Sequence, residues 1–297
     1  MATSQTPKRA TARRKTNWTV EQRYQFIEFR LFWSGHINRS DLMEVFGISK
    51  QQASNDLASY IEGRKSNLTY DKSLRTYVRG KNFRPRFMEP DANEFFSQLQ
   101  AVEQGLLEEN RSWILPLPGY GAPPAPVRGV KPEILRDVVT AIRAGQGLHV
   151  LYQSFSRPEP GWRWIEPHSL AFDGFRWHAR AFCRNDDVFK DFLLSRILGV
   201  EAYDEASNSV VGDTAWNTEV TLQMGPHPEL SDAQKYVIGL DYGMEEGVTQ
   251  IKVRRAMLYY ALKRLGLDTD PAARRPQDQQ IILLNRDEVL GTKENNK

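Results

Sequence analysis

"SDLMEVFGISKQQASNDLASYIEG", from Ser40 to Gly63, has the pattern of two short helices joined by a tight turn. Ser40 is suited to cap the first helix. Gly47 is suited to end it, because glycine readily adopts the left-handed conformation at a helix C-terminus. Ser49 then begins a second helix, and Gln52 completes a capping box with it. One face of this second helix is apolar: Ala53, Leu57, Tyr60 and Ile61. These features predict a helix-turn-helix.

The opposite face of the second helix is polar and rich in amide side chains. Gln and Asn side chains form paired hydrogen bonds with adenine edges in the major groove, which such a helix enters. The sequence therefore predicts that this face, together with residues that precede the helix, contacts double-stranded DNA. The expected contact residues are Arg39, Ser49, Lys50, Gln51, Gln52, Ser54, Asn55 and Ser59.

A basic hairpin is expected directly after these helices, in "LTYDKSLRTYVRGKNFRPRF", which begins at Leu68. Residues 68–70 and 74–78 favour strands, and residues 71–73 favour a turn. Lys72, Arg75 and Arg79 would then project from a wing that contacts DNA phosphates. The alternative is a small helical domain whose charges are merely solvated.

Positive charge is concentrated in this part of the chain. Residues 1–86 contain 17 Lys and Arg against 7 Asp and Glu, a net charge of +10. The remaining residues contain 23 against 30, a net charge of −7, which gives the +3 of the whole chain. A polyanionic partner is therefore expected to bind the N-terminal third.

Length and composition indicate a globular protein of two or three domains. The chain has 297 residues, of which 40% are hydrophobic and 26% charged. No apolar run approaches the roughly 20 residues that cross a bilayer, so no membrane association is expected. The single cysteine, Cys183, rules out an intramolecular disulfide framework and indicates the reducing cytoplasm. No metal-binding spacing of His, Asp and Glu occurs, and no cofactor is expected.

The first helix of the basic region, expected over residues 18–35, has two apolar faces. Tyr24, Ile27 and Leu31 form one face, whereas Phe26, Phe29 and Trp33 form the other. Two faces predict a second packing partner, either a dimer mate or a neighbouring domain. An overfilled core with one exposed aromatic side chain is the alternative.

Short strands dominate the middle of the chain and predict a small β-barrel of Sm or SH3 type. The expected strands are residues 148–155, 163–165, 170–172, 175–184 and 189–197. In "FRWHARAFC", from Phe175 to Cys183, alternation divides the side chains between two faces. Trp177, Ala179, Ala181 and Cys183 are expected in the core, whereas Arg176, His178 and Arg180 lie on the opposite face.

Three stretches of this region resemble the WYL domain of bacterial transcription regulators: "LYQSF", "RWIEPHSLAFDGFRWHARAFC" and "FKDFLLSRIL". The Trp-Tyr-Leu signature corresponds to Trp177, His178 and Ala179. The pattern around it is similar to one branch, the repressors of BrxR and CapW type that are encoded beside phage-defence systems. The resemblance spans roughly residues 19–267. It implies an N-terminal winged helix-turn-helix, a middle WYL domain and a C-terminal dimerising extension.

The resemblance also implies a ligand pocket that binds a nucleotide or a nucleic-acid-derived effector. Its expected residues are Tyr152, Ser154, His168, Trp177, His178, Arg180, Phe192 and Arg196. The residue types agree with this chemistry, because guanidinium groups bind phosphate through paired hydrogen bonds and aromatic rings stack on bases. A solvated strand face is the alternative for the two arginines. Altogether we expect a dimeric repressor that binds an inverted-repeat operator and controls a phage-defence operon.

Two other classes of function fit less well. A hydrolytic triad of Ser154, His168 and either Asp173 or Asp191 lacks a nucleophile elbow, a phosphate-binding glycine loop and a metal cluster, so we do not expect an enzyme. An accessory protein that binds RNA or single-stranded nucleic acid through the barrel is the stronger alternative. It conflicts with the position of the positive charge, which lies in the winged helix.

The expected organisation is therefore an α+β multidomain chain. The C-terminal extension is expected as a small α/β domain, with strands at 219–223 and 249–253 and a helix at 254–267 whose apolar stripe suits either a partner subunit or its own core. The expected segments are a disordered basic arm (1–17), the winged helix-turn-helix (18–88), a helical and Pro-rich linker (89–146), the WYL domain (147–205), the dimerisation extension (206–270) and a tail (271–297).

Overall fold

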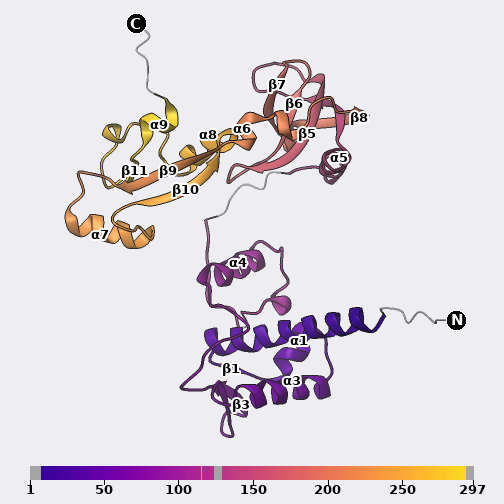
Figure 1. The fold of residues 1–297 in the computed structure, drawn as a ribbon, viewed down its shortest axis with the longest axis vertical. Helices are drawn as coiled ribbons and strands as arrows, with labels where there is room; N and C mark the ends of the chain where they lie inside the picture. The colour runs from indigo at the N-terminus through magenta and orange to yellow at the C-terminus, as the bar shows by residue number, and fades with distance from the viewer. Residues whose placement is uncertain (1–7, 115, 124–128, 292–297) are drawn as a thin grey trace, which may run out of the picture. The chain divides into compact units, whose positions relative to one another are not determined.

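The computed structural model describes residues 8–114, 116–123 and 129–291 (Figure 1). Of residues 8–19 and of Asn110 it describes the backbone alone. The chain divides into two compact units, residues 1–124 and residues 125–297, and each is described by itself.

The N-terminal unit contains the expected helix-turn-helix and wing. Helix α1 spans Lys8–Trp33, α2 spans Arg39–Phe46 and α3 spans Lys50–Gly63. A three-stranded sheet with the order β1-β3-β2 is formed by β1 (His36–Ile37), β2 (Leu68–Asp71) and β3 (Thr76–Arg79). The core lies between these elements and includes Phe26, Ile27, Leu31, Leu57 and Tyr60.

Two of the expected helix ends are confirmed. Gly47 ends α2 with a left-handed φ of 63°, and its N–H donates to the carbonyl of Met43. Ser49 caps α3, because its hydroxyl accepts a hydrogen bond of 3.2 Å from the N–H of Gln52.

Other local expectations were wrong. Asn38, rather than Ser40, precedes α2, and its N–H donates to the carboxylate of Asp41 at 2.9 Å. The expected capping box at Gln52 does not form, because this side chain donates to Asp56 instead. Helix α1 begins at Lys8 rather than at Trp18, so it includes part of the expected arm. Residues 1–7 of that arm lie outside the described residues.

The second apolar face of α1 packs against the segment that follows the wing. Helix α4 (Ala92–Glu103) is followed by a short 3-10 helix, η1 (Glu109–Arg111). Phe29 of α1 forms a buried cluster with Leu99 of α4 and with Ile114. Phe95 of α4 stacks on Phe29 with ring centroids 6.3 Å apart. The second partner is therefore part of the expected linker, packed within the same unit.

The second unit begins with the WYL region. Helix α5 (Pro132–Ala144) packs on a five-stranded sheet with the order β7-β6-β5-β4-β8. The strands are β4 (Gln146–Tyr152), β5 (Gly161–Phe172), β6 (Trp177–Cys183), β7 (Val188–Leu193) and β8 (Ile197–Glu205), with η2 (Leu194–Arg196) before β8. In the described residues β7 and β8 are the two edges, so the sheet is open. The expected Sm or SH3-like barrel is not confirmed.

Strand β6 has the expected alternation along most of its length. Ala179, Ala181 and Cys183 are fully buried in the core of this sheet. Trp177 was expected in the same row but is 49% exposed, and its ring packs on Phe172 at 4.7 Å. Arg180 and His178 project from the opposite face yet are also buried, so the C-terminal segments must cover that face.

The C-terminal part is a small α/β domain. After η3 (Val210–Gly212) come α6 (Thr214–Asn217), β9 (Glu219–Pro226), α7 (Asp232–Asp241), β10 (Thr249–Arg254), η4 (Arg255–Met257) and α8 (Leu258–Arg264). It ends with η5 (Pro271–Ala273), β11 (Ile281–Leu283) and α9 (Arg286–Leu290).

The tail expected from residue 271 was placed too early. Strand β11 pairs antiparallel with β9, which gives a sheet with the order β10-β9-β11 (Figure 1). Ile281, Leu283 and Val289 are buried in the core of this domain beside Leu222 and Leu262. Residues 281–289 therefore complete the C-terminal core, because β9 would otherwise lack a neighbour on that side.

Candidate nucleic-acid interface and sensor network

The outer face of α3 presents a pair of amide side chains to solvent. Gln51 and Asn55 are both exposed, and the Gln51 amide N–H donates to the Asn55 side-chain oxygen at 3.0 Å. Lys50 at the start of α3 and Ser59 one turn beyond Asn55 are exposed as well. This hydrogen bond holds the two amides side by side on the exposed face of the helix. Gln and Asn are residue types that pair with adenine edges in the major groove.

Three of the expected DNA contacts are more involved in the structure of the unit. Gln52 is half-buried and donates to Asp56 at 2.9 Å. The Ser54 hydroxyl donates to the carbonyl of Lys50 at 2.9 Å and accepts from Arg39 at 3.3 Å. Arg39 itself is exposed, and it lines a surface hollow together with Lys50. The interactions of Arg39 therefore place a second cation beside the N-terminus of α3.

The wing holds three exposed cations, Lys72 and Arg75 at its turn and Arg79 at the far end of β3. The Asp71 carboxylate accepts hydrogen bonds from the N–H groups of residues 73 and 74, which fixes the turn. Arg75 occupies this turn with a φ of 52°. Lys72 and Arg75 form no ion pair with any described residue, and Arg79 donates to the carbonyl of Phe32 at 3.2 Å. Their charge is thus available for phosphates.

A buried polar framework holds α1, α3 and the segment after the wing together. Glu28 is 0% exposed, and its carboxylate accepts from the Tyr60 hydroxyl at 3.0 Å. The same carboxylate accepts from the backbone N–H groups of Arg86, Phe87 and Met88 at 2.6–3.1 Å. This carboxylate therefore fixes the direction in which the chain leaves the wing.

A buried ion pair joins α3 to α1. Arg23 of α1 donates to the two carboxylate oxygens of Asp56 at 2.6 and 3.1 Å, and both residues are buried. Since Asp56 also accepts from Gln52, the inner side of α3 is tied to α1 along its first turns. The helix that carries the exposed amides is therefore fixed against α1.

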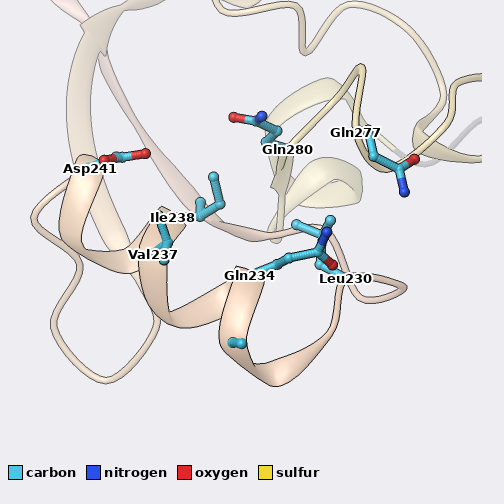
Figure 2. Close-up of a pocket in the computed structure, with 8 residues that line it drawn as sticks. Leu230, Gln234, Val237, Ile238, Asp241, Gln277 and Gln280 are labelled. Carbon is cyan, nitrogen blue, oxygen red and sulfur yellow. The ribbon is translucent and has the colours of Figure 1, made fainter.

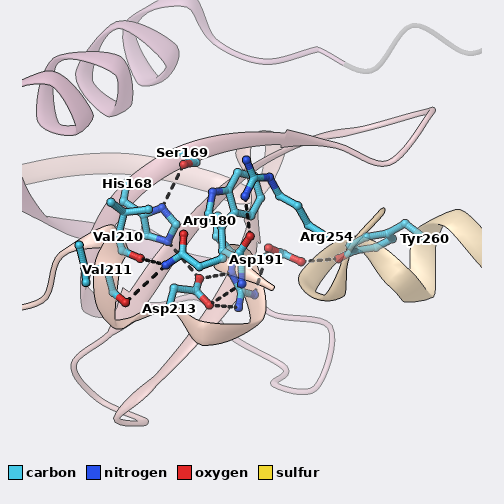
Figure 3. A network of polar contacts seen from close by, with 11 residues as sticks. His168, Ser169, Arg180, Asp191, Val210, Val211, Asp213, Arg254 and Tyr260 are labelled. Atoms are coloured by element: carbon cyan, nitrogen blue, oxygen red, sulfur yellow. Dashed lines mark hydrogen bonds and ion pairs between the residues drawn. The ribbon is translucent and has the colours of Figure 1, made fainter. Parts of the chain in front are cut away.

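Arg180 on β6 is the centre of a buried charge network (Figure 3). Its guanidinium, in a residue that is 6% exposed, donates to both carboxylate oxygens of Asp213 at 2.7 and 3.1 Å. A third nitrogen lies 3.3 Å from the carboxylate of Asp191 on β7. Burial lowers the pKa of Arg180, but the bonds to Asp213 and Asp191 outweigh it and raise the pKa.

The two histidines of the expected pocket each pair with an aspartate. His168 lies 3.1 Å from Asp213 through Nε2 and 3.0 Å from the Ser169 hydroxyl through Nδ1. Burial lowers the pKa of His168 and outweighs the opposing effect of Asp213. His178 lies 3.0 Å from Asp173 through Nε2. Burial raises the pKa of Asp173, but hydrogen bonds from His178 and neighbouring groups lower it well below its usual range.

The remaining expected ligand residues lie away from Arg180. Tyr152 and Phe192 are in the core on the other face of the sheet, with ring centroids 5.1 Å apart, and the Tyr152 oxygen accepts from the N–H of Leu193. Arg196 lies over the ring of the exposed Phe155 at 5.5 Å. Ser154 contacts the hydroxyl of Ser156 at 3.3 Å. Trp177 is exposed, so the structure divides the expected set among several places.

The triad considered from the sequence is not assembled. Within the described residues Ser154 forms a hydrogen bond with Ser156 and not with His168, and His168 pairs with Asp213 rather than with Asp173 or Asp191. No group of described side chains could hold a metal ion.

Sequence reasoning missed Asp213 and the role of Tyr260 in this network, although it had considered Asp173 and Asp191 for a triad. Asp213 was not among the candidate residues, and no local pattern marks it beyond its position as the N-cap of α6. Tyr260 was noted only as part of an apolar stripe, yet its hydroxyl donates to Asp191 at 3.0 Å. Its contact with β7 depends on the packing of α8, which residue spacing cannot reveal.

A cavity of about 400 Å³ lies in the C-terminal domain, between α7 and the segment that precedes β11 (Figure 2). Leu230, Val237 and Ile238 form its apolar wall, and Gln234 and Gln280 lie at its edge. None of its lining residues belongs to the set expected to bind a ligand.

No helix in the described residues is both long and apolar enough to cross a bilayer.

Three family models match this chain. The BrxR transcriptional regulator winged helix-turn-helix domain matches residues 19–101, and the WYL domain matches residues 133–202. The BrxR transcriptional regulator C-terminal dimerization domain matches residues 219–289. These spans agree with the three folded regions described above, including the strand β11 that was expected in a tail.

Three relatives named DNA-binding transcriptional repressor CapW, from Stenotrophomonas maltophilia, Escherichia coli (strain KTE188) and Pseudomonas aeruginosa, are each 37% identical to this chain. The alignments cover 93% of this chain and 92%, 93% and 93% of the relatives, respectively. A solved structure of proteasome accessory factor B/C (PafBC) of Arthrobacter aurescens is 16% identical to this chain, and the match covers 84% of this chain and 43% of that one. Its TM-score is 0.23, which is too low to support a structural comparison. The CapW relatives are regulators rather than enzymes. From the three domains and these relatives together, the chain belongs to the BrxR/CapW family of WYL-domain transcriptional repressors.

Proposed function

We propose that this protein is a homodimeric repressor in the cytoplasm that binds an inverted-repeat operator in double-stranded DNA. The exposed pair Gln51 and Asn55 on α3 carries this proposal, because two aligned amides flanked by cations suit base edges in a major groove. Lys72 and Arg75 on the wing would contact the neighbouring phosphates.

A dimer would place two copies of α3 on the two half-sites. The match to a C-terminal dimerization domain supports this arrangement. Half-sites of a two-fold symmetric regulator lie about one helical turn of DNA apart, so the operator is expected to be an inverted repeat with that spacing.

Fluorescence anisotropy with DNA from the region upstream of the gene tests the proposal. We expect the duplex that contains the inverted repeat to bind at least 1,000-fold more tightly than a scrambled duplex at the same salt concentration, within the usual range of specificity ratios. Single-stranded RNA of the same sequence serves as the competitor. Equal or tighter binding of that RNA would favour the alternative, a protein that binds single-stranded nucleic acid through the WYL sheet.

We further propose that a nucleotide or nucleic-acid-derived effector binds the WYL domain and releases the operator, which derepresses a phage-defence operon. Of the eight expected residues, we propose His168, His178 and Arg180 for this site, because their contacts with Asp213, Asp191 and Tyr260 connect them. Tyr152, Ser154, Trp177, Phe192 and Arg196 lie away from Arg180 and are not included in the proposed site. Arg180 is the best placed of the three for a phosphate, since a guanidinium binds two of its oxygens in parallel. The effector must bind the released state more tightly than the operator-bound state. Equal affinity for free and operator-bound protein would refute this regulation.

A further inference from the structure

We propose that Asp213 acts as an internal anion that occupies Arg180 in place of the effector phosphate. Effector binding and the attachment of the C-terminal domain to the WYL domain then exclude one another. The ligand half of this inference rests on the effector proposed above, whereas the attachment itself is a property of the chain alone.

The first observation is that all three guanidinium nitrogens of Arg180 already have carboxylate partners. Two of its nitrogens donate to Asp213, and the third lies beside Asp191 (Figure 3). Asp213 is 1% exposed, so its contact is part of the interior. A phosphate that binds this guanidinium must therefore displace a carboxylate.

The second observation is that Asp213 belongs to the segment that leads into the C-terminal domain. It is the N-cap of α6 and accepts from the N–H of Trp216 at 3.0 Å. The ring of Trp216 in turn lies 4.8 Å from the guanidinium of Arg254 on β10, which donates to the Trp216 carbonyl at 2.6 Å. Helix α6 is thus held by the WYL domain through Asp213 and by the C-terminal sheet through Arg254.

The third observation is a parallel attachment through Asp191. Tyr260 on α8 donates to the second carboxylate oxygen of Asp191 at 3.0 Å. The Tyr260 ring also packs against His178, with ring centroids 5.3 Å apart. Two elements of the C-terminal domain, α6 and α8, are therefore connected to the same guanidinium through two different aspartates.

Electrostatics disfavours a phosphate on Arg180 while both carboxylates remain in place. A buried guanidinium needs a counter-anion, and two carboxylates already supply it. A phosphate that entered beside them would add like charge in a region of low dielectric constant, which is strongly unfavourable. Departure of Asp213 avoids this repulsion, but it also removes the cap of α6 and the partner of His168.

The direction of the switch follows from the proposed release of the operator. With Asp213 on Arg180, α6 and α8 are fixed to the WYL sheet, and this is the operator-binding state. With phosphate on Arg180, α6 is detached and the C-terminal domain turns relative to the WYL domain. Because that domain joins the two subunits, the spacing of the two α3 helices changes.

The decisive experiment uses hydrogen exchange and binding on the full chain. The added ligands are the 5′-phosphorylated dinucleotide pTpT and its unphosphorylated form TpT. In the wild type, saturating pTpT should increase the exchange rate of the Trp216 amide at least tenfold, and TpT should leave it unchanged. Unchanged or stronger protection of this amide at saturating pTpT would overturn the inference.

Asp213→Asn removes the competing charge while keeping a residue that caps helices well. We expect this variant to bind pTpT at least tenfold more tightly than the wild type, and to bind the operator at least tenfold more weakly without any ligand. Asp278→Asn is the matched control, because it removes an exposed aspartate that pairs with Arg275 in the same unit, and it should change neither affinity.

If Asp213→Asn does not fold, Tyr260→Phe tests the same attachment. It removes only the hydroxyl that reaches Asp191, and we expect a twofold to fivefold loss of operator affinity. Normal operator affinity in the folded variants would overturn the attachment. Failure of both proteins to bind pTpT would overturn the phosphate exchange, whereas failure of the wild type to bind the operator would refute the proposed function instead.

Discussion

Replacing Glu28 in α1 should strongly destabilise the winged helix, although this residue is buried and not part of the exposed face that we assign to DNA. Its buried carboxylate accepts hydrogen bonds from four donors, the Tyr60 hydroxyl and the backbone N–H groups of Arg86, Phe87 and Met88. Asn67 donates to the Tyr60 oxygen at 2.9 Å, so the hydroxyl proton of Tyr60 is directed to Glu28. Glu28→Ala leaves all four donors without this acceptor.

The expected loss follows from the number of these donors. A buried donor left without a partner costs about 1–3 kcal/mol. The three backbone groups are only partly buried, so water replaces some of the lost bonds and the lower figure applies. Four donors at about 1 kcal/mol each give a loss of about 4 kcal/mol, against a domain stability of about 5–15 kcal/mol. Glu28→Gln keeps one oxygen but turns an NH₂ group toward donors, so about 2–3 kcal/mol is expected.

Urea titration of the full chain, followed by hydrogen exchange in α1 and residues 84–88, measures this loss. Glu89→Gln is the matched control, since Glu89 is exposed in the same segment and should have no effect on the free energy of unfolding. Operator affinity of Glu28→Ala should fall in proportion to the unfolded fraction. A loss below 1 kcal/mol with unchanged protection of residues 86–88 would refute the assigned role of the carboxylate.

Three further outcomes are expected. Gln51→Ala combined with Asn55→Ala should lower operator affinity by about 1–3 kcal/mol per lost base contact while non-specific binding persists, as anisotropy on operator and scrambled duplexes will show. Lys72→Ala should weaken binding to every duplex alike and reduce the slope of log affinity against log salt by about 1. Hydrogen bonds from Cys183 and Lys190 lower the pKa of Asp186 to about 2, so this aspartate stabilises the folded state above its unfolded pKa, and that stabilisation is lost as the pH falls toward 2. The difference in urea midpoint between Asp186→Asn and the wild type should therefore be present at pH 6 and vanish near pH 2.

Local patterns predicted the N-terminal fold well, because the deciding interactions are short in sequence. Gly47 and Ser49 end and begin helices through contacts within four residues, so their roles follow from residue type. The two apolar faces of α1 predicted a second packing partner, but this partner is a helix of the same unit and not the expected dimer mate or neighbouring domain. Its identity as α4 could not be derived, since the contact of Phe29 with Leu99 joins segments seventy residues apart (99 − 29).

The WYL region shows the limit of reasoning from strand alternation. Alternation correctly separated Arg180 from the core row of β6, and this face was then expected to be open to a ligand. The structure covers the face with Asp213 and Tyr260, which lie outside the WYL region in sequence. Closure of the sheet could not be derived either, because β7 and β8 are joined by the short η2 whether or not their edges pair.

The carboxylates around Arg180 also give a reason why the anion sensor that we propose would lie at a contact between domains. A guanidinium selects phosphate over water best when it is buried, but a buried cation without an anion is strongly destabilising. Without a ligand, such a sensor therefore requires a carboxylate of the protein itself beside the guanidinium. The segment that carries this carboxylate is the segment that a bound ligand displaces. Asp191 lies on the same sheet as Arg180 and reaches the C-terminal domain only through the hydroxyl of Tyr260. Asp213 belongs to the segment that leads to the dimerisation domain, so in our proposal its displacement would convert a difference in anion affinity into a change of domain contacts. The coupling free energy between two such sites is typically about 1–3 kcal/mol, or about 5- to 150-fold in affinity. A loss of operator affinity of that size releases the operator when the repressor concentration exceeds the dissociation constant by less than the same factor.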